Sequence, residues 1–188
     1  NTQIGPIYVS YPSDKNISNF ILSLTKTSPS YDFESFDKSV FISFGGTSHD
    51  VIANPDTNGN SSATVGKVTK GAGEVWAGNV ITTTNPIADL AVKNQIKLKV
   101  WSPRAGSSMT MKLENIDDAN INSGEITVPV VGNSAWEEVV FDMSAIDSSK
   151  EYRKIVWFFD LGTQGEGGDA WTFYVDDFSQ TAKVTEPL

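Results

Sequence analysis

The stretch Gln95-Ile96-Lys97-Leu98-Lys99-Val100-Trp101 decides the fold, because apolar and polar residues alternate along it without a break. Successive side chains of a β-strand point to opposite faces of a sheet, so this period of two predicts a strand with one buried face. The buried face is expected to carry Ile96, Leu98 and Val100. Trp101 then falls on the opposite, solvated face, which also carries two lysines.

The same alternation returns at 108–114 and again at 125–130. Pro129 cannot donate a ladder hydrogen bond, which indicates an edge strand or a bulge in the second of these runs. Turn clusters of Gly, Asn, Asp, Ser and Pro separate further strand-like runs at 31–36, 40–44, 63–69, 137–141, 154–159 and 171–178. No segment of ten or more residues keeps a helical period. This spacing predicts an all-β fold, a two-sheet antiparallel β-sandwich of the jelly-roll kind.

Length and composition indicate one globular domain with an extension. The chain has 188 residues, 39% of them hydrophobic, and no cysteine, which excludes disulfides, thiolate zinc sites and cysteine nucleophiles. We expect residues 1–29 to be a linker or the end of a preceding domain, 30–182 the sandwich, and 183–188 a tail. A chain that opens Asn1-Thr2-Gln3, without a leader, is expected to be a processed piece of a larger multimodular protein.

The charge of the chain excludes some partners. A formal net charge of -9 repels phosphate backbones, and no cluster of lysine or arginine offsets it, so nucleic acid is not expected as a partner. An acidic surface suits neutral glycans and bound cations. No apolar run approaches the roughly 20 residues that a membrane span needs, so none is expected in this chain.

Motifs for catalysis are searched for and not found. His49 is the only histidine, and no serine lies in a Gly-x-Ser-x-Gly elbow. No glutamate is followed two residues later by aspartate, the spacing that places two glycosidase carboxylates on one face of a strand. The glycine-rich run at 162–168 is acidic and lacks the lysine of a phosphate-binding loop. The sequence therefore predicts a protein that is not an enzyme.

Short motifs spread from about Tyr31 to Thr181 carry a resemblance. In chain order they are Asp32-Phe33-Glu34, Phe44-Gly45-Gly46, Asn54-Pro55-Asp56, Val65-Gly66-Lys67, the run 71–78, Val100-Trp101-Ser102-Pro103, Lys112-Leu113-Glu114-Asn115, Trp136-Glu137-Glu138, Phe141-Asp142 and Phe173-Tyr174-Val175-Asp176-Asp177-Phe178. Together they resemble the jelly-roll carbohydrate-binding modules attached to laminarinases and surface glycan-binding proteins of marine Bacteroidetes. The resemblance implies a secreted or cell-surface, monomeric protein that binds polysaccharide, above all laminarin-like β-1,3-glucan, without cleaving it.

The resemblance also implies a structural calcium ion that joins the first and last core strands. The matching positions are Glu34 with Asp176 or Asp177. Calcium prefers hard oxygen ligands, and carboxylates from two adjacent strand ends would supply them. The alternative is that these carboxylates cap strand ends or pair with Lys38.

Aromatic side chains are the natural platforms for the flat C–H faces of sugars. Trp76 is the first candidate, because the small residues around it let a ligand approach closely, and Glu74 lies beside it in the same motif. Trp101 is the second, on the face it shares with lysines. The alternative for both is packing. The other tryptophans are expected in the core or at one end of the sandwich, and they are Trp136, Trp157 and Trp171.

Lys112 and Glu114 occupy the more exposed face of their strand and are candidate polar contacts to sugar hydroxyls. If that strand neighbours the one that carries Trp101, the two faces combine into a polar patch beside an indole. The alternative is a cross-strand ladder of lysine and glutamate with no ligand. Two other functions therefore stay open, a structural or adhesive sandwich without a sugar site and a hydrolase with an unrecognised pair of carboxylates.

Overall fold

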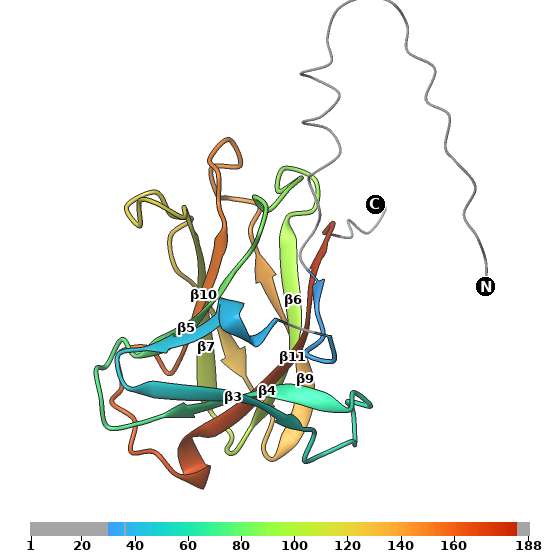
Figure 1. Ribbon diagram of the computed structural model, residues 1–188, viewed down its shortest axis with the longest axis vertical. Coiled ribbons are helices and arrows are strands. Elements are labelled where there is room, and N and C mark those ends of the chain that lie inside the picture. Colours follow the sequence, from blue (N-terminus) through green and yellow to red (C-terminus); the bar gives the residue numbers. More distant parts are fainter. Residues whose placement is uncertain (1–29, 36, 184–188) are drawn as a thin grey trace, which may run out of the picture.

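The computed structural model describes residues 30–35 and 37–183, and these form two antiparallel β-sheets packed face to face (Figure 1). Sheet A has the order β3 (Thr47–Ala53), β4 (Thr64–Lys70), β11 (Thr172–Thr181), β6 (Gln95–Ser102) and β9 (Ala135–Asp142), and β1 (Ser30–Tyr31) pairs with the far half of β11. Sheet B has the order β2 (Phe41–Phe44), β5 (Gly78–Thr82), β10 (Lys154–Phe159), β7 (Ser107–Glu114) and β8 (Ile126–Val130). Two short 3-10 turns, η1 (Lys38–Val40) and η2 (Asp169–Trp171), complete this part of the chain.

The core lies between the inner faces of the two sheets, and strand parity decides which side chains enter it. Every second residue of β6 is at most 1% exposed, and these are Ile96, Leu98 and Val100. Sheet B contributes Met109, Met111, Leu113, Ile155 and Trp157, all fully buried. The predicted two-sheet antiparallel sandwich is confirmed.

The strand boundaries differ from the sequence-based expectation in three places. The run at 31–36 forms a strand only at its start, because the backbone of Phe33 adopts a positive φ of 58° that ends regular pairing. Strands β3 and β5 were not predicted, since the polar and glycine residues in them hide the alternation. Pro129 lies in β8, the outermost strand of sheet B, as its missing donor predicts.

The order of the strands places the exposed faces of β6 and β7, which could have formed one patch, on different sheets. β6 carries Trp101 in sheet A, whereas β7 carries Lys112 in sheet B, where it pairs with β10 and β8. The two strands are therefore not neighbours, and the combined patch of Lys112 and Trp101 is excluded. The solvent-facing sides of the two sheets are separate surfaces.

The predicted linker over 1–29 and most of the predicted tail, 184–188, lie outside the described residues. Within the described part, no helix is long and apolar enough to cross a membrane.

Candidate functional site

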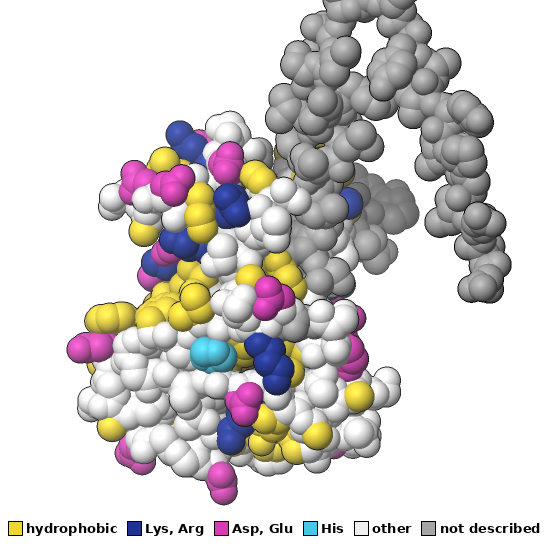
Figure 2. Space-filling model, viewed as in Figure 1, with side chains coloured by type: hydrophobic (Ala, Val, Ile, Leu, Met, Phe, Trp, Pro, Cys, Tyr) yellow, Lys and Arg dark blue, Asp and Glu magenta, His cyan; other side chains and the backbone are white. Residues whose placement is uncertain are grey.

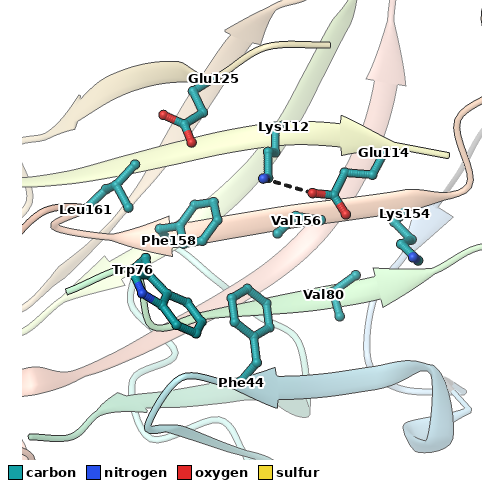
Figure 3. Close-up of a pocket in the computed structure, with 10 residues that line it drawn as sticks. All are labelled: Phe44, Trp76, Val80, Lys112, Glu114, Glu125, Lys154, Val156, Phe158 and Leu161. Carbon is teal, nitrogen blue, oxygen red and sulfur yellow. Dashed lines mark ion pairs between the residues drawn. The ribbon is translucent and has the colours of Figure 1, made fainter. Parts of the chain in front are cut away.

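A groove of about 410 Å³ lies on the outer face of sheet B (Figure 3). Its lining comes from every strand of that sheet except β8, together with the loop before β5, the residue before β8 and the second residue after β10. The lining residues are Phe44, Trp76, Val80, Lys112, Glu114, Glu125, Lys154, Val156, Phe158 and Leu161.

Cross-strand pairing explains why these side chains gather. Val80 of β5 lies opposite Val156 of β10, which lies opposite Lys112 of β7. Residues directly opposite in neighbouring strands project from the same face, so one row crosses the sheet from apolar to charged side chains. The exposed Ile42 of β2 begins the row opposite Val80. The groove therefore has an apolar floor and a polar edge.

Three aromatic side chains form one end of the groove. Trp76 is 50% exposed and stacks on Phe44 with ring centroids 6.3 Å apart and planes 23° apart. Phe158 meets Phe44 edge to face at 5.8 Å. Figure 2 shows hydrophobic side chains gathered in a band over this part of the molecule, with basic and acidic side chains bordering it. Of the three rings, Trp76 is open to solvent, Phe44 is partly exposed and Phe158 is only 4% exposed beneath them.

The loop that carries Trp76 packs its backbone directly on the turn between β2 and β3. Glu74 N donates to Gly45 O at 2.7 Å, and a Cβ atom on Gly73 would lie only 2.2 Å from the same oxygen. Glycine is therefore required at position 73 for this approach. The contact places Trp76 beside Phe44, which precedes that turn.

The polar edge of the groove contains four charged side chains, of which two form an ion pair. Lys112 and Glu114 form an ion pair of 2.8 Å, and the Lys112 ammonium also lies 5.7 Å from the centre of the Phe158 ring. Within residues 30–35 and 37–183, the side chains of Glu125 and Lys154 make no hydrogen bond or ion pair. The Glu125 carboxylate, as an acceptor, and the Lys154 ammonium, as a donor, thus remain available to a ligand in the groove.

The structure brings together three of the candidate binding residues, Trp76, Lys112 and Glu114. Glu74 is exposed in the Trp76 loop but does not line the groove. Sequence reasoning missed the side chains of Phe44, Phe158, Lys154 and Glu125. The alternation along β10 could have predicted Phe158 on the outer face of sheet B, because this strand is apolar on both of its faces.

Trp101 lies on the outer face of sheet A, in a second aromatic cluster. Its ring centre is 5.1 Å from that of Tyr174, which in turn is 6.5 Å from that of Trp136. Both indole N–H groups donate to Asp56, from Trp101 to the carboxylate at 3.1 Å and from Trp136 to the carbonyl at 2.7 Å. The rings are tilted by 53° and 41° from Tyr174, so they form no flat platform, and they anchor the loop at 54–63.

The remaining tryptophans occupy two environments. Trp157 is fully buried, as expected. Trp171, which was expected in the core, is only partly buried, and Trp136, which was expected at one end of the sandwich, is partly buried too. The Arg104 guanidinium lies 4.1 Å from the centre of the Trp171 ring, a cation–π contact that covers one side of it.

Two of the candidate calcium ligands, Asp176 and Glu34, contact the 54–63 loop between β3 and β4. Asp176 is fully buried there and accepts hydrogen bonds from the Asn60 side chain at 2.7 Å and from Asp177 N at 2.9 Å. Burial raises the pKa of Asp176 to about 6, against the hydrogen bonds from Asn60 and Ser62. A buried carboxylate of this kind would be stabilised by a cation.

The other two candidate ligands have protein partners. Glu34 accepts from the backbone N–H groups of Ala63 and Thr64, so it caps the loop that covers Asp176. The Asp177 carboxylate forms an ion pair of 2.9 Å with Lys99. In the described part of the chain, no three His, Cys, Asp or Glu side chains lie together as metal ligands do. Asp176 fits a calcium site best, and carbonyl or amide oxygens would have to complete the coordination.

His49 does not lie in the groove. Its Nδ1 is 2.7 Å from Ser43 Oγ, which accepts a hydrogen bond from Asn79, and its ring packs on Phe41 with centroids 4.5 Å apart. Burial lowers the pKa of His49, and the nearby Asp50 opposes this shift. These contacts describe a packing histidine on the surface of β3.

Solved structures with a similar fold include carbohydrate-binding modules. The family 11 module of the cellulosomal cellulase Lic26A-Cel5E of Clostridium thermocellum has a TM-score of 0.54 and 11% identity, over 86% of this chain and 99% of that module. The CBM22-2 xylan-binding domain of Paenibacillus barcinonensis Xyn10C has a TM-score of 0.51 and 14% identity, over 82% of this chain and 98% of that domain. An exo-β-agarase has a TM-score of 0.61 and 9% identity, over 83% of this chain and 25% of that enzyme.

At these identities the similarity establishes the fold, which is the β-sandwich of carbohydrate-binding modules. No family model matches the sequence, and a search of curated proteins finds no relative.

Proposed function

We propose that this protein is a non-catalytic carbohydrate-binding module that holds a polysaccharide in the groove on sheet B. The observation that carries the proposal is the exposed Trp76 ring, stacked on Phe44, in a groove where Glu125 and Lys154 have no partner among the described residues. Aromatic rings take the C–H faces of sugars, and charged side chains form strong hydrogen bonds with hydroxyl groups. Both requirements are met within one groove.

A β-glucan is the proposed ligand, and laminarin-like β-1,3-glucan is its first candidate. Support comes from the motifs that resemble glucan-binding modules and from a similar structure solved with a β-1,3-1,4-mixed-linked tetrasaccharide. A xylanase module with the same sandwich was solved with xylohexaose, so β-linked glycans in general belong in the test. This function would place the protein outside the cell, at the surface or secreted, as a monomeric part of a larger multimodular protein.

The groove supports binding better than cleavage. A glycosidase acid needs an environment that keeps its carboxyl group protonated, such as an apolar pocket. Glu114 is ion-paired with Lys112, and Glu125 is exposed to solvent. The two carboxylates of the groove are therefore suited to accept hydrogen bonds from sugar hydroxyls.

We propose calcium as a structural cofactor at the loop end of sheet A. Asp176 would be its main carboxylate ligand and Glu34 a second, because the Asp177 carboxylate is already paired with Lys99. The ion would neutralise the buried Asp176 and attach the 54–63 loop to the last strand. This site lies apart from the groove, so calcium would affect folding stability more than sugar contact.

Affinity electrophoresis and calorimetry with laminarin, mixed-linkage β-glucan, xylan and charged algal polysaccharides test the function. Retarded migration and saturable heat with a β-glucan are expected. Unretarded migration on every polysaccharide would reject the binding proposal and favour a structural sandwich. Release of reducing sugar by the purified protein would show that it is an enzyme.

A further inference from the structure

A buried lysine lies directly behind the aromatic end of the groove. Lys70 is the last residue of β4 and shares its parity with Gly66 and Val68, whose side of the strand faces the core. It is 0% exposed, the only charged side chain besides Asp176 that is fully buried in the described part of the chain. Burying an ammonium group is costly unless all of its donors are satisfied.

The ammonium of Lys70 has three backbone acceptors. Its Nζ donates to Phe159 O at 2.7 Å, to Asp160 O at 2.9 Å and to Val75 O at 3.3 Å. A lysine carries three N–H donors, so all of them are used. Burial lowers the pKa of Lys70, while the Asp160 carboxylate opposes the shift.

The three acceptors belong to the two segments that form the aromatic end of the groove. Val75 directly precedes Trp76, and the other two carbonyls lie between Phe158 and Leu161 in the chain. Gly162 N also donates to Val75 O, at 3.1 Å, which closes the contact between the segments. One ammonium group thus joins the backbone of the Trp76 loop to the backbone that follows β10.

Few other contacts hold the Trp76 loop against this second segment. The Gln164 side chain donates to Gly73 O at 2.9 Å, but Gln164 is exposed. Trp76 and Val75 are about half exposed, so apolar burial contributes little to their position. The Glu74–Gly45 hydrogen bond holds the loop against the turn after β2, whereas its placement against the segment after β10 depends mainly on Lys70 and the Gly162–Val75 hydrogen bond.

We infer that Lys70 is a positioning residue for the groove, which fixes the placement of Trp76 relative to Phe158 and Leu161 without touching the ligand. This inference rests on the proposed function of the groove. A platform that is held rigid before binding loses less conformational entropy on binding, so affinity depends on the residue that orders it. Lys70 acts on the ligand only through the backbone of the Trp76 loop.

The test compares Lys70→Met with Lys67→Met in the whole chain. Both variants replace a lysine of β4 by a side chain of similar length, but Lys67 faces solvent on sheet A and lies outside the groove. Calorimetry with laminarin and mixed-linkage glucan gives the affinity, and amide hydrogen exchange gives the opening of 71–77. A third variant, Trp76→Ala, removes the platform but leaves the Lys70 hydrogen bonds in place.

Lys70→Met is expected to weaken glucan binding by about tenfold and to speed amide exchange at 71–77, while β7 and β10 stay protected. Lys67→Met should change neither quantity, and Trp76→Ala should weaken binding without faster exchange. Lys70→Met that retains wild-type affinity, or that exchanges no faster at 71–77, would overturn the inference. If wild type binds no glycan, the proposed function fails, but the exchange data still decide whether Lys70 orders the loop.

A measurement on the unaltered protein covers the case in which Lys70→Met does not fold. Because Lys70 joins 71–77 to 159–162, the slow amides of both segments are expected to open together, with one free energy and one denaturant dependence. Independent opening of the two segments would contradict the positioning role. Joint opening below the global unfolding free energy supports it.

Discussion

The outer faces of the two sheets both carry clustered aromatic rings, but the protein uses them differently. On sheet A, Trp101 and Trp136 direct their indole N–H groups to Asp56 and lie under the loop at 54–63. On sheet B, Trp76 is half exposed, and the charged groups of Glu125 and Lys154 have no partner among the described residues. An aromatic cluster whose polar groups are satisfied holds structure, whereas one beside unsatisfied groups is available to a ligand.

The largest expected effect concerns the outer face of sheet A, where calcium is proposed to bind. Calcium at about one hundred times its Kd is expected to raise the free energy of unfolding by about 3 kcal/mol, because it binds only the folded chain. Thermal unfolding with and without a chelator measures this difference. Asp176→Asn should remove the response to the chelator, and an unchanged Tm in the wild type would exclude calcium.

The pH dependence of the calcium-free protein sharpens the same prediction. Burial raises the pKa of Asp176 to about 6, above its ordinary value of 3.8, so the folded state binds this proton more tightly than the unfolded state. Stability from this group is fully present below about pH 4 and is lost as the pH rises through about 6, by on the order of 3 kcal/mol in all. Unfolding titrations in chelator should show this loss in the wild type and not in Asp176→Asn. An equal pH dependence in both proteins would contradict the assignment.

Trp76→Ala tests the proposed ligand site on the outer face of sheet B. Loss of an exposed aromatic platform is expected to weaken glucan binding by about thirtyfold, or roughly 2 kcal/mol, with little change in Tm. The matched control is Trp101→Ala, which should lower Tm but leave the affinity, measured by calorimetry, close to that of the wild type. Equal losses of affinity in both variants would show that the two faces do not differ as described.

Asp56→Ala tests the anchoring of the loop on sheet A. It removes the carboxylate that accepts the Trp101 indole N–H, which is expected to cost about 1 kcal/mol of folding stability. Chemical denaturation measures this loss, and Asp50→Ala, an exposed acidic residue on β3, is the control. Glucan affinity should stay unchanged. A weakened affinity in Asp56→Ala would place a ligand on sheet A as well.

The smallest expected effect is that of Lys154→Met, which removes from the polar edge of the groove an ammonium group that has no partner among the described residues. Affinity for β-glucan is expected to fall by about threefold to fivefold, the range of one solvent-exposed hydrogen bond. Lys67→Met is again the control, since it removes the same charge from the other sheet. Unchanged calorimetric affinity in Lys154→Met would restrict the groove to its aromatic end.

The face of the sheet on which each side chain of a strand lies was predictable, because it depends only on the alternation of neighbouring residues in the sequence. The alternation in β6 assigned Ile96 to the core and Trp101 to the outer face, and both are found there. Trp76 was selected from its small neighbours, and it is the most exposed of the five tryptophans. Strands β3 and β5 were not predicted, because the hydrogen bonds that pair their polar residues, such as Asn79 of β5, cannot be recognised in the sequence.

Several site residues could not be predicted because they meet only through long-range pairing. Phe44 joins Trp76 through the backbone contact of Glu74 with Gly45, and Lys154 joins Glu114 through the register of β10 with β7. Lys70 gave one local signal, a lysine at an inward position of a strand, which indicates a buried partner. Its three carbonyl acceptors lie up to 90 residues away.

The sequence by itself determined that this protein is a two-sheet β-sandwich without the common catalytic motifs, since periodicity and missing residue types are local properties. Only the tertiary structure decided which tryptophan stands open beside charged groups and which one anchors a loop. The physical reason is strand order: hydrogen bonding places β7 beside β10 and β6 beside β11, and this choice distributes similar side chains over two separate faces.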